Sequence, residues 1–201
     1  MRTHKHVKQL KEYYDYDLSH ITQKEVEGIV EDLYEAMNIN GICPPIFDIV
    51  NRLGFSIYKY PFEKEGADVK GFFGIGIDFN INENSCFFLV DRDDPEWSWR
   101  MVSAYLLAYY LIHINDPETD YFHYHFSKDD IHNSLEARMA LTLLMPEEQF
   151  LSQKEFIETS YQVKEMVLTD EQEIEMLADT FRVSKKMVES RMIMLKKQGK
   201  I

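Results

Sequence analysis

Hydrophobic residues recur every three or four positions between residues 26 and 37, which predicts an amphipathic helix. Thr22 and Glu25 precede this stretch at the spacing of a capping box, in which two side chains satisfy free amides of the first helical turn. A shorter apolar set follows two prolines and is stopped by a glycine, so a second helix is predicted over residues 46–53. The fold is therefore expected to begin with two helices, after a polar extension over residues 1–21.

Three segments rich in phenylalanine and isoleucine then predict β-strands. They cover residues 55–62, 71–79 and 85–90, and a turn-prone run containing three asparagines separates the second from the third. The glycines of the second segment have a spacing found in phosphate-binding loops, but no helix start follows them, so a closely approached strand is the better interpretation. A small, mostly antiparallel sheet is expected.

Helices are predicted for most of the remaining chain. Asp94 and the proline after it indicate a helix start, and the helix continues through an apolar run over residues 101–112. Because apolar residues surround this helix on all sides, we expect it to lie at the centre of the fold. The next helix is predicted to begin at residues 127–130, to carry His132 and Glu136, and to end near a proline.

The C-terminal third is also predicted to be helical. Residues 147–168 show a weak helical pattern, and residues 170–197 indicate two helices broken near residues 182–184. The fold class is therefore α+β. We expect a main domain over residues 22–168 and a separate C-terminal segment over residues 169–201.

Composition and charge exclude several classes of protein. The 201 residues are 45% hydrophobic and 13% aromatic, which is typical of a folded globular chain. The net charge of −13 argues against nonspecific binding of nucleic acid by the whole molecule, although residues 176–201 alone carry a net charge of +5. The longest apolar run is too short to span a bilayer, and no signal-like segment follows the polar N-terminus. A cytoplasmic protein without a membrane partner is expected. Cys43 and Cys86 lack metal-ligand spacing and are expected to be buried thiols.

Two segments of the predicted central helices carry a family resemblance. The first is Arg-Met-Val-Ser-Ala-Tyr-Leu-Leu-Ala-Tyr-Tyr-Leu-Ile-His over residues 100–113, and the second begins at Glu136 and ends in Leu-Leu-Met-Pro at Pro146. Together they resemble the ImmA/IrrE family of bacterial metallopeptidases, in which an Arg-Phe-Thr-x-Ala-His-Glu-x-Gly-His helix precedes a Glu-x-x-Ala…Leu-Leu-Met-Pro segment. The order of elements fits from about Thr22 to the C-terminus. The resemblance implies a zincin-like domain followed by a helix-turn-helix-like segment.

The chain departs from that family at the catalytic positions. Tyr105, Leu106 and Tyr109 stand where the family has its first histidine ligand, its catalytic glutamate and its second histidine ligand, and only Glu136 coincides with a family metal ligand. Two histidines four residues apart bind zinc, and the glutamate polarises the attacking water. Leucine cannot accept a proton, and neutral tyrosine, with a pKa of about 10, is a poor zinc ligand. Neither a catalytic residue nor a metal cofactor is therefore expected.

The loss of zinc would change the situation of Glu136 most. A buried carboxylate without a partner is costly, so we expect a hydroxyl of Tyr105 or Tyr109 to donate a hydrogen bond to Glu136 in place of the metal, unless Glu136 is simply exposed. These tyrosines could belong to packed core, which is the favoured interpretation, or to a retained peptide groove. The groove interpretation would also use three neighbouring aromatic residues, Tyr110, Trp97 and Trp99.

Two alternatives of other functional classes remain. A relocated metal site is conceivable because a few histidines gather near Glu136, although solvated or core histidines are favoured; these histidines are His123, His125 and His132. In the C-terminal segment, Lys185 and Lys186 would begin the recognition helix of a helix-turn-helix. The negative charge of the rest of the chain favours a structural or protein-docking role over DNA binding.

The favoured function is that of a non-catalytic protein-binding regulator, a pseudopeptidase. Active members of the resembled family are implicated in cleaving helix-turn-helix transcriptional repressors, often encoded beside them on mobile elements. A bacterial copy without ligands could still hold such a repressor. The alternatives are a metal-dependent hydrolase with a relocated site and a DNA-binding regulator that acts through the C-terminal segment.

Overall fold

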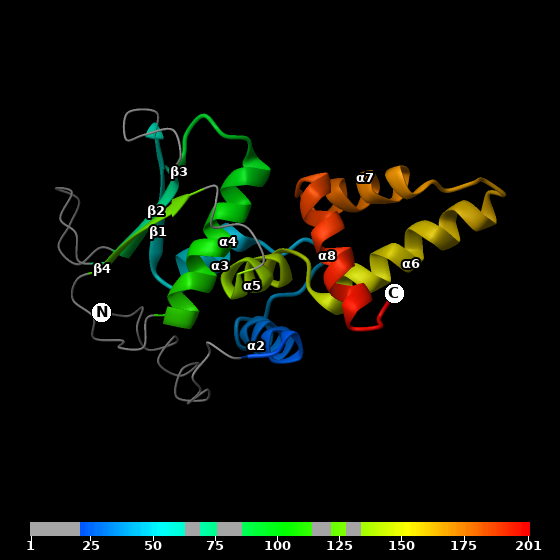
Figure 1. Ribbon diagram of the computed structural model, residues 1–201, viewed down its shortest axis with the longest axis horizontal. Helices are drawn as coiled ribbons and strands as arrows, with labels where there is room; N and C mark the ends of the chain where they lie inside the picture. The colour runs from blue at the N-terminus through cyan, green and yellow to red at the C-terminus, as the bar shows by residue number, and fades with distance from the viewer. Residues whose placement is uncertain (1–20, 63–68, 76–85, 114–121, 128–133) are drawn as a thin grey trace.

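The structure, a computed structural model, describes residues 21–62, 69–75, 86–113, 122–127 and 134–201 (Figure 1). The fold class is α+β, as predicted. The described elements are, in chain order, α2 (Gln23–Ala36), α3 (Ile46–Arg52), β1 (Phe55–Tyr60), β2 (Val69–Ile75), β3 (Cys86–Asp91), α4 (Glu96–His113), β4 (Phe122–Ser127), α5 (Leu135–Leu144), α6 (Glu147–Val163), α7 (Asp170–Phe181) and α8 (Lys185–Lys197).

Local sequence signals place the first two helices correctly. The Thr22 side chain accepts from the Glu25 amide, and the Glu25 carboxylate accepts from the Thr22 amide, which confirms the capping box at the start of α2. The short helix α3 forms after the two prolines and ends at Arg52, with Leu53 as its C-cap. Gly54 follows with a φ of 90°, a conformation that L side chains rarely adopt, so the predicted stop signal has a backbone reason.

The sheet has four strands in the order β1-β3-β2-β4. β1 pairs with β3 in parallel, whereas β2 pairs antiparallel with both β3 and β4, so the prediction of a mostly antiparallel sheet is confirmed. β4 was not predicted from the sequence. In that segment, histidines alternate with aromatic residues at the period of a strand, but the histidines were interpreted as candidate metal ligands instead.

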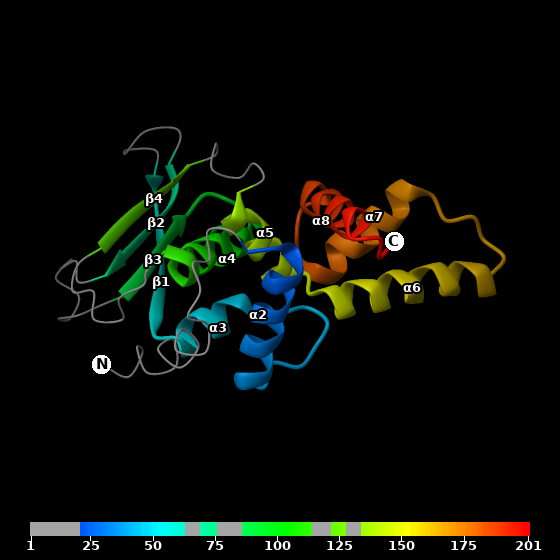
Figure 2. The ribbon, with the colours of Figure 1, turned by 60° about the horizontal axis from the view of Figure 1, so that its bottom comes forward.

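One face of the sheet packs on α3 and α4 (Figures 1 and 2). Aromatic rings of the sheet interlock with one ring of α4. The Phe55 ring lies 4.8 Å from that of Phe88 and 4.9 Å from that of Tyr110, measured between centroids. Phe73 meets Tyr110 edge to face at 5.7 Å. Offset and edge-to-face contacts of this kind add to the hydrophobic gain of burial. They fix α4 against β1, β2 and β3.

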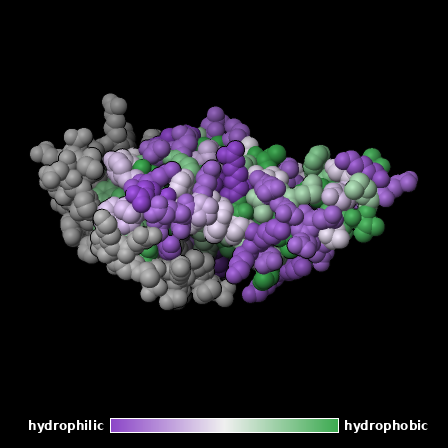
Figure 3. Space-filling model, turned by 90° about the horizontal axis from the view of Figure 1, so that it is seen from above, coloured by the Kyte–Doolittle hydropathy of each residue, from purple (hydrophilic) through white to green (hydrophobic). Residues whose placement is uncertain are grey.

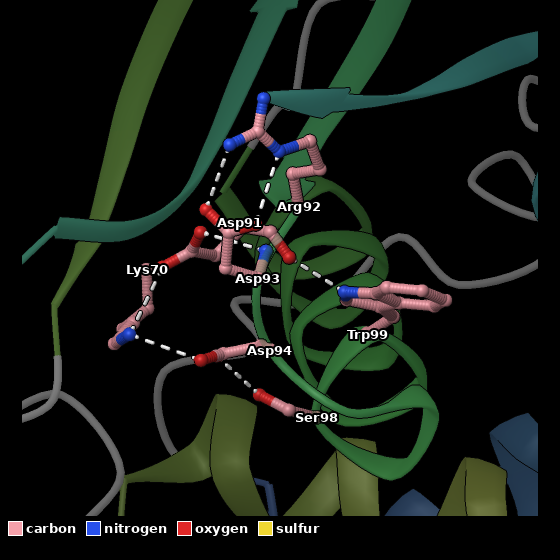
Figure 4. A network of polar contacts seen from close by, with 7 residues as sticks. All are labelled: Lys70, Asp91, Arg92, Asp93, Asp94, Ser98 and Trp99. Atoms are coloured by element: carbon pink, nitrogen blue, oxygen red, sulfur yellow. Dashed lines mark hydrogen bonds and ion pairs between the residues drawn. The ribbon is translucent and has the colours of Figure 1, made fainter. Parts of the chain in front are cut away.

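The start of α4 differs from the prediction. The helix begins at Glu96, and the backbone carbonyl of Pro95 accepts the first helical hydrogen bonds. The carboxylate of Asp94 instead accepts from the Ser98 hydroxyl at 2.8 Å and from the Lys70 ammonium at 3.1 Å (Figure 4). Asp94 was expected as the helix cap, but its side chain ties the helix to β2.

The end of β3 reinforces the same junction. Asp91 is buried and binds the Lys70 ammonium at 3.0 Å, while its backbone carbonyl accepts from the indole of Trp99 at 2.6 Å (Figure 4). The Lys59 ammonium lies 3.4 Å from the centre of the Trp99 ring, a cation–π contact. α4 is therefore held at its N-terminal end by polar contacts and along its length by the aromatic core, and its central position is confirmed.

The start of α5 was also predicted wrongly. The helix begins at Leu135, because the hydroxyl of Ser134 caps it by accepting from the Ala137 amide at 3.1 Å. Ser127 belongs to β4 and pairs with Val69 in the sheet. A serine can cap a helix or lie in a strand, and the sequence pattern alone predicted the wrong serine as the cap of this helix.

The C-terminal helices form the end of the molecule away from the sheet (Figures 1 and 2). α6 ends at Val163, earlier than the predicted residue 168. The predicted break between α7 and α8 is confirmed, and Arg182 occupies it in the left-handed conformation with a φ of 52°. Hydrophobic side chains gather where α6 passes into α7 (Figure 3); exposed residues there are Val163, Met166 and Val167.

A buried ion pair joins α8 to the rest of the fold. Arg191 is fully buried and binds both carboxylate oxygens of Glu27 on α2, at 2.6 and 2.9 Å. Its Nε also donates to the backbone carbonyl of Met145 at 2.8 Å. Gln23 donates to the same Glu27 carboxylate at 2.8 Å and to Thr142 on α5 at 3.1 Å. α2, α5 and α8 therefore share one polar network.

A second buried arginine links the end of α7 to α4. Arg100 donates through Nη2 to the carbonyls of Pro44 at 3.1 Å and Phe181 at 3.3 Å. The half-buried thiol of Cys43 lies 3.3 Å from the same nitrogen. Both cysteines are free, and Cys86 is buried as expected, whereas Cys43 was expected to be buried and is only half-buried.

Replacing Arg191 with methionine should leave the Glu27 carboxylate buried without its cation. We expect a loss of about 3–5 kcal/mol in the free energy of unfolding, measured by urea denaturation. Lys200→Met is the matched control, because Lys200 pairs with Glu147 while 46% exposed, and its loss should cost less than about 1 kcal/mol. Similar small losses for both variants would contradict a central role for the buried pair.

Candidate functional site

The candidate site lies between α4 and α5, which pack against each other. A ridge of side chains at four-residue spacing runs along α4, because residues four apart share one face of a helix. In order, the ridge comprises Trp97, Met101, Tyr105, Tyr109 and His113. The positions of the resembled metal site are its third and fourth members, so they lie in the middle of the α4 surface that meets α5.

Tyr105 and Leu106 are packed in the hydrophobic core. Tyr105 is 3% exposed and Leu106 is completely buried. Tyr110, on the opposite side of α4, belongs to the aromatic cluster on the sheet. These three positions therefore follow the core interpretation. Leu106, at the position that corresponds to the catalytic glutamate of the resembled family, is surrounded by core residues and offers no proton acceptor.

His113 provides the link between α4 and Glu136. Its Nε2 forms a short hydrogen bond with the Glu136 carboxylate, and the Tyr109 ring packs on the imidazole with 4.4 Å between ring centroids. The side chain of Glu136 is 13% exposed and that of His113 is 42% exposed. We expected a tyrosine hydroxyl to bind Glu136, but the structure gives this role to the histidine one turn further along the ridge.

The environment of Glu136 favours its charged form. Partial burial by itself raises the pKa of this carboxyl, but hydrogen bonds from His113, Ser134 and the backbone lower it further than burial raises it. The pKa of Glu136 therefore lies below its ordinary value of 4.5. The sequence did not identify His113 as the partner, because the pairing depends on how α4 and α5 pack.

The relocated metal site stays a prediction. Within the described ranges, no three histidine, cysteine, aspartate or glutamate side chains lie close enough to hold a metal ion. Of the candidate ligands, Glu136 is the one whose side chain is described. The side chains of His123 and His125, and all of His132, lie outside the described residues.

A groove opens beside this site, between α8 on one side and α4 and α5 on the other. It encloses about 800 Å³. Its apolar lining residues are Trp97, Met101, Ala137, Leu141, Met187, Ile193 and Met194. Its polar ones are Gln23, Arg138, Ser184, Lys186, Ser190, Lys197 and Gln198. The sequence analysis missed this groove, although apolar residues at helical spacing on α8 were a signal for it.

The two lysines predicted at the start of a recognition helix lie in different surroundings. Lys185 faces α7, with its ammonium 3.3 Å from Glu175 and 3.9 Å from Glu171. Lys186 lines the groove. Lys185 is thus partly neutralised by its own chain, whereas Lys186 lies in a basic and apolar surface.

Comparison with known proteins does not identify a family. No protein-family model matches the chain, and neither the curated proteins nor the solved structures gave a significant match. Among the helices that the structure describes, even α4 lacks the combination of length and hydropathy that a membrane span requires.

Glu136→Gln should remove the charged partner of His113. Because the folded-state pKa of Glu136 is lowered, its contribution to stability is present above the unfolded-state pKa and is lost as pH falls through the folded-state pKa. We expect the variant to be about 1 kcal/mol less stable at about pH 6, a modest value because His113 is partly exposed, and we expect the difference to shrink as the pH is lowered and the Glu136 carboxylate becomes protonated.

Urea denaturation of both proteins across this pH range measures the effect. Exposed Glu155, in the middle of α6, offers a matched control, and Glu155→Gln should change the free energy of unfolding less than Glu136→Gln does at about pH 6. An equal pH dependence in the two variants would contradict the ion pair between His113 and Glu136.

Proposed function

We propose that this protein is a non-catalytic binding protein: a zincin-like, ImmA/IrrE-like pseudopeptidase with a helix-turn-helix-like C-terminal segment. The observation that carries the proposal is that side chains without zinc chemistry occupy the positions where the resembled family has its zinc ligands and catalytic glutamate. Tyr105 and Leu106 are buried, and Tyr109 packs on the histidine that binds Glu136. These side chains offer neither a pair of imidazole ligands nor a base to activate water.

The same observations favour binding as the function that remains. A helix pair that has lost its reactive groups still presents a surface, and here an apolar groove with a basic rim adjoins it. On the resemblance, we propose a regulatory role in a bacterial cytoplasm, in a phage or other mobile element. The proposed partner is a protein, with a helix-turn-helix transcriptional repressor as the first candidate.

The first test is the metal content of the folded protein, purified without chelators or a histidine tag. We expect elemental mass spectrometry to find far less than one zinc per chain, because the family positions cannot supply ligands. Circular dichroism on the same sample checks that the chain is folded. About one zinc per chain, retained through dialysis, would overturn the proposal and favour the relocated site at His123, His125, His132 and Glu136.

A second test restores the missing ligands. If α4 and α5 keep the geometry of the resembled family, Tyr105→His/Tyr109→His should retain about one zinc per chain with Glu136 as third ligand. Adding Glu136→Gln to this variant should abolish retention. Met101→His/Tyr105→His is the matched control, since it places the same pair one turn further from His113, the residue that binds Glu136. Equal zinc retention by both histidine pairs would argue against a zincin-like arrangement.

A further inference from the structure

We infer that the groove between α8 and the α4–α5 pair binds an amphipathic helix of a partner protein, with an apolar face and acidic residues near both ends. This inference rests on the proposed binding function and specifies its partner. It is carried by three features of the groove: its length, the distribution of its charges, and the exposure of its apolar residues.

The length of the groove favours a helix. Groove-lining residues occur along the whole of α8, from Ser184 at its N-cap to Gln198 at its C-cap. The thirteen residues of α8 make a wall of about 20 Å at 1.5 Å per residue. A partner helix of about three and a half turns would match this wall, and helices commonly bind such grooves through apolar residues at i, i+3 or i+4, and i+7.

The charges of the groove favour acidic flanks on that helix. Its described lining includes three cations, Arg138, Lys186 and Lys197, and no carboxylate. None of these three side chains forms an ion pair with another described residue. Lys186 and Lys197 lie near opposite ends of α8. A basic rim on a chain of net charge −13 is a local reversal of sign, so it would attract an acidic segment and repel a basic one.

The apolar residues supply a floor and two exposed contacts. Met101, Ala137, Leu141 and Met187 are buried at the base of the groove. Ile193 and Trp97 are 53% and 44% exposed, which is unusual for large hydrophobic side chains on one surface. Methionine side chains adapt to different neighbours, so this floor could accommodate leucine or phenylalanine residues of a partner.

Other occupants fit less well. A DNA backbone would meet the cations but would leave the apolar floor unused, and a compact ligand would leave much of the wall along α8 uncovered. A second copy could offer α6, whose exposed Phe156 and Val163 are seven residues apart and accompanied by Glu155. That contact would join two different surfaces of the chain, so it would build a ring or an open chain unless two copies exchanged it reciprocally, and each of these outcomes appears as self-association.

The test uses a synthetic helical peptide of about fourteen residues, with leucines at i, i+3 and i+7 and glutamates near both ends. Fluorescence anisotropy with the full chain should give saturable binding that weakens with salt. A peptide with lysines in place of the glutamates should bind at least about tenfold more weakly, because it meets the basic rim with like charge. No saturable binding of the acidic peptide would overturn the inference.

Two groove variants locate the binding. Ile193→Glu should weaken acidic-peptide binding at least about tenfold, because it places a carboxylate against the apolar face of the peptide. Val163→Glu, a change of an exposed apolar residue to the same acid outside the groove, should leave binding unchanged. The double variant Lys186→Glu/Lys197→Glu should no longer bind the acidic peptide and should bind the lysine peptide instead. Its control is Lys196→Glu, on the same helix but outside this groove, which should leave the binding of both peptides unchanged.

The charge swap guards against an effect of misfolding, because an unfolded variant cannot gain a ligand. Binding that ignores the groove variants would overturn the inference. Self-association that both Ile193→Glu and Phe156→Glu abolish would also overturn it, since the occupant would then be a second copy. Neither result would alter the metal content, so failure of this inference is distinguishable from failure of the proposed function.

Discussion

The fold depends on the buried ion pair between Arg191 and Glu27. An isolated charge in a protein interior is very unfavourable, so each partner is tolerated only while the other is present and its remaining hydrogen-bonding groups are satisfied. Here the arginine fork matches both carboxylate oxygens, and its third nitrogen binds the Met145 carbonyl. Such a pair adds little net stability compared with apolar residues of the same size, but it permits few other arrangements of α2, α5 and α8.

The pair also anchors the α8 wall of the groove. On α8, Arg191 is one turn from both Met187 and Met194, which line the groove, and on α2 the Gln23 side chain both lines the groove and donates to Glu27. The residues that anchor α8 are thus immediate neighbours of the residues that form its exposed wall. Because these contacts hold the α8 wall in place before a partner binds, ordering that wall would add little to the free-energy cost of binding.

The sequence predicted those features that depend on neighbouring residues. The capping box at Thr22 and the break at Arg182 involve residues only a few positions apart, and both were placed correctly. The starts of α4 and α5 were wrong because Asp94 and Ser127 are good caps in isolation but are used by the sheet and its loop. The fold class followed from hydrophobic periodicity. This periodicity indicates which face of a helix or strand is buried, but it does not indicate which other element covers that face.

The candidate site was only partly predictable for the same reason. That Tyr105 and Leu106 cannot do zinc chemistry follows from their side chains alone. That His113 binds Glu136 depends on the packing of two helices, and the two residues are 23 positions apart in the sequence. The groove is harder still, because its walls come from segments as far apart as Gln23 and Gln198. Periodicity on α8 marks an apolar face but cannot say whether another helix of the chain covers it.

The ridge on α4 connects the groove with the Glu136 contact. Trp97 and Met101 open onto the groove, Tyr105 and Tyr109 fill the positions of the resembled metal site, and His113 closes the far end by binding Glu136. A helix seated in the groove would therefore lie beside buried or hydrogen-bonded side chains, with no activated water or nucleophile offered by them. On the proposed function, a partner would be held without being cut, because the residues that stand in place of the resembled family's catalytic groups belong to the same helix that shapes the groove.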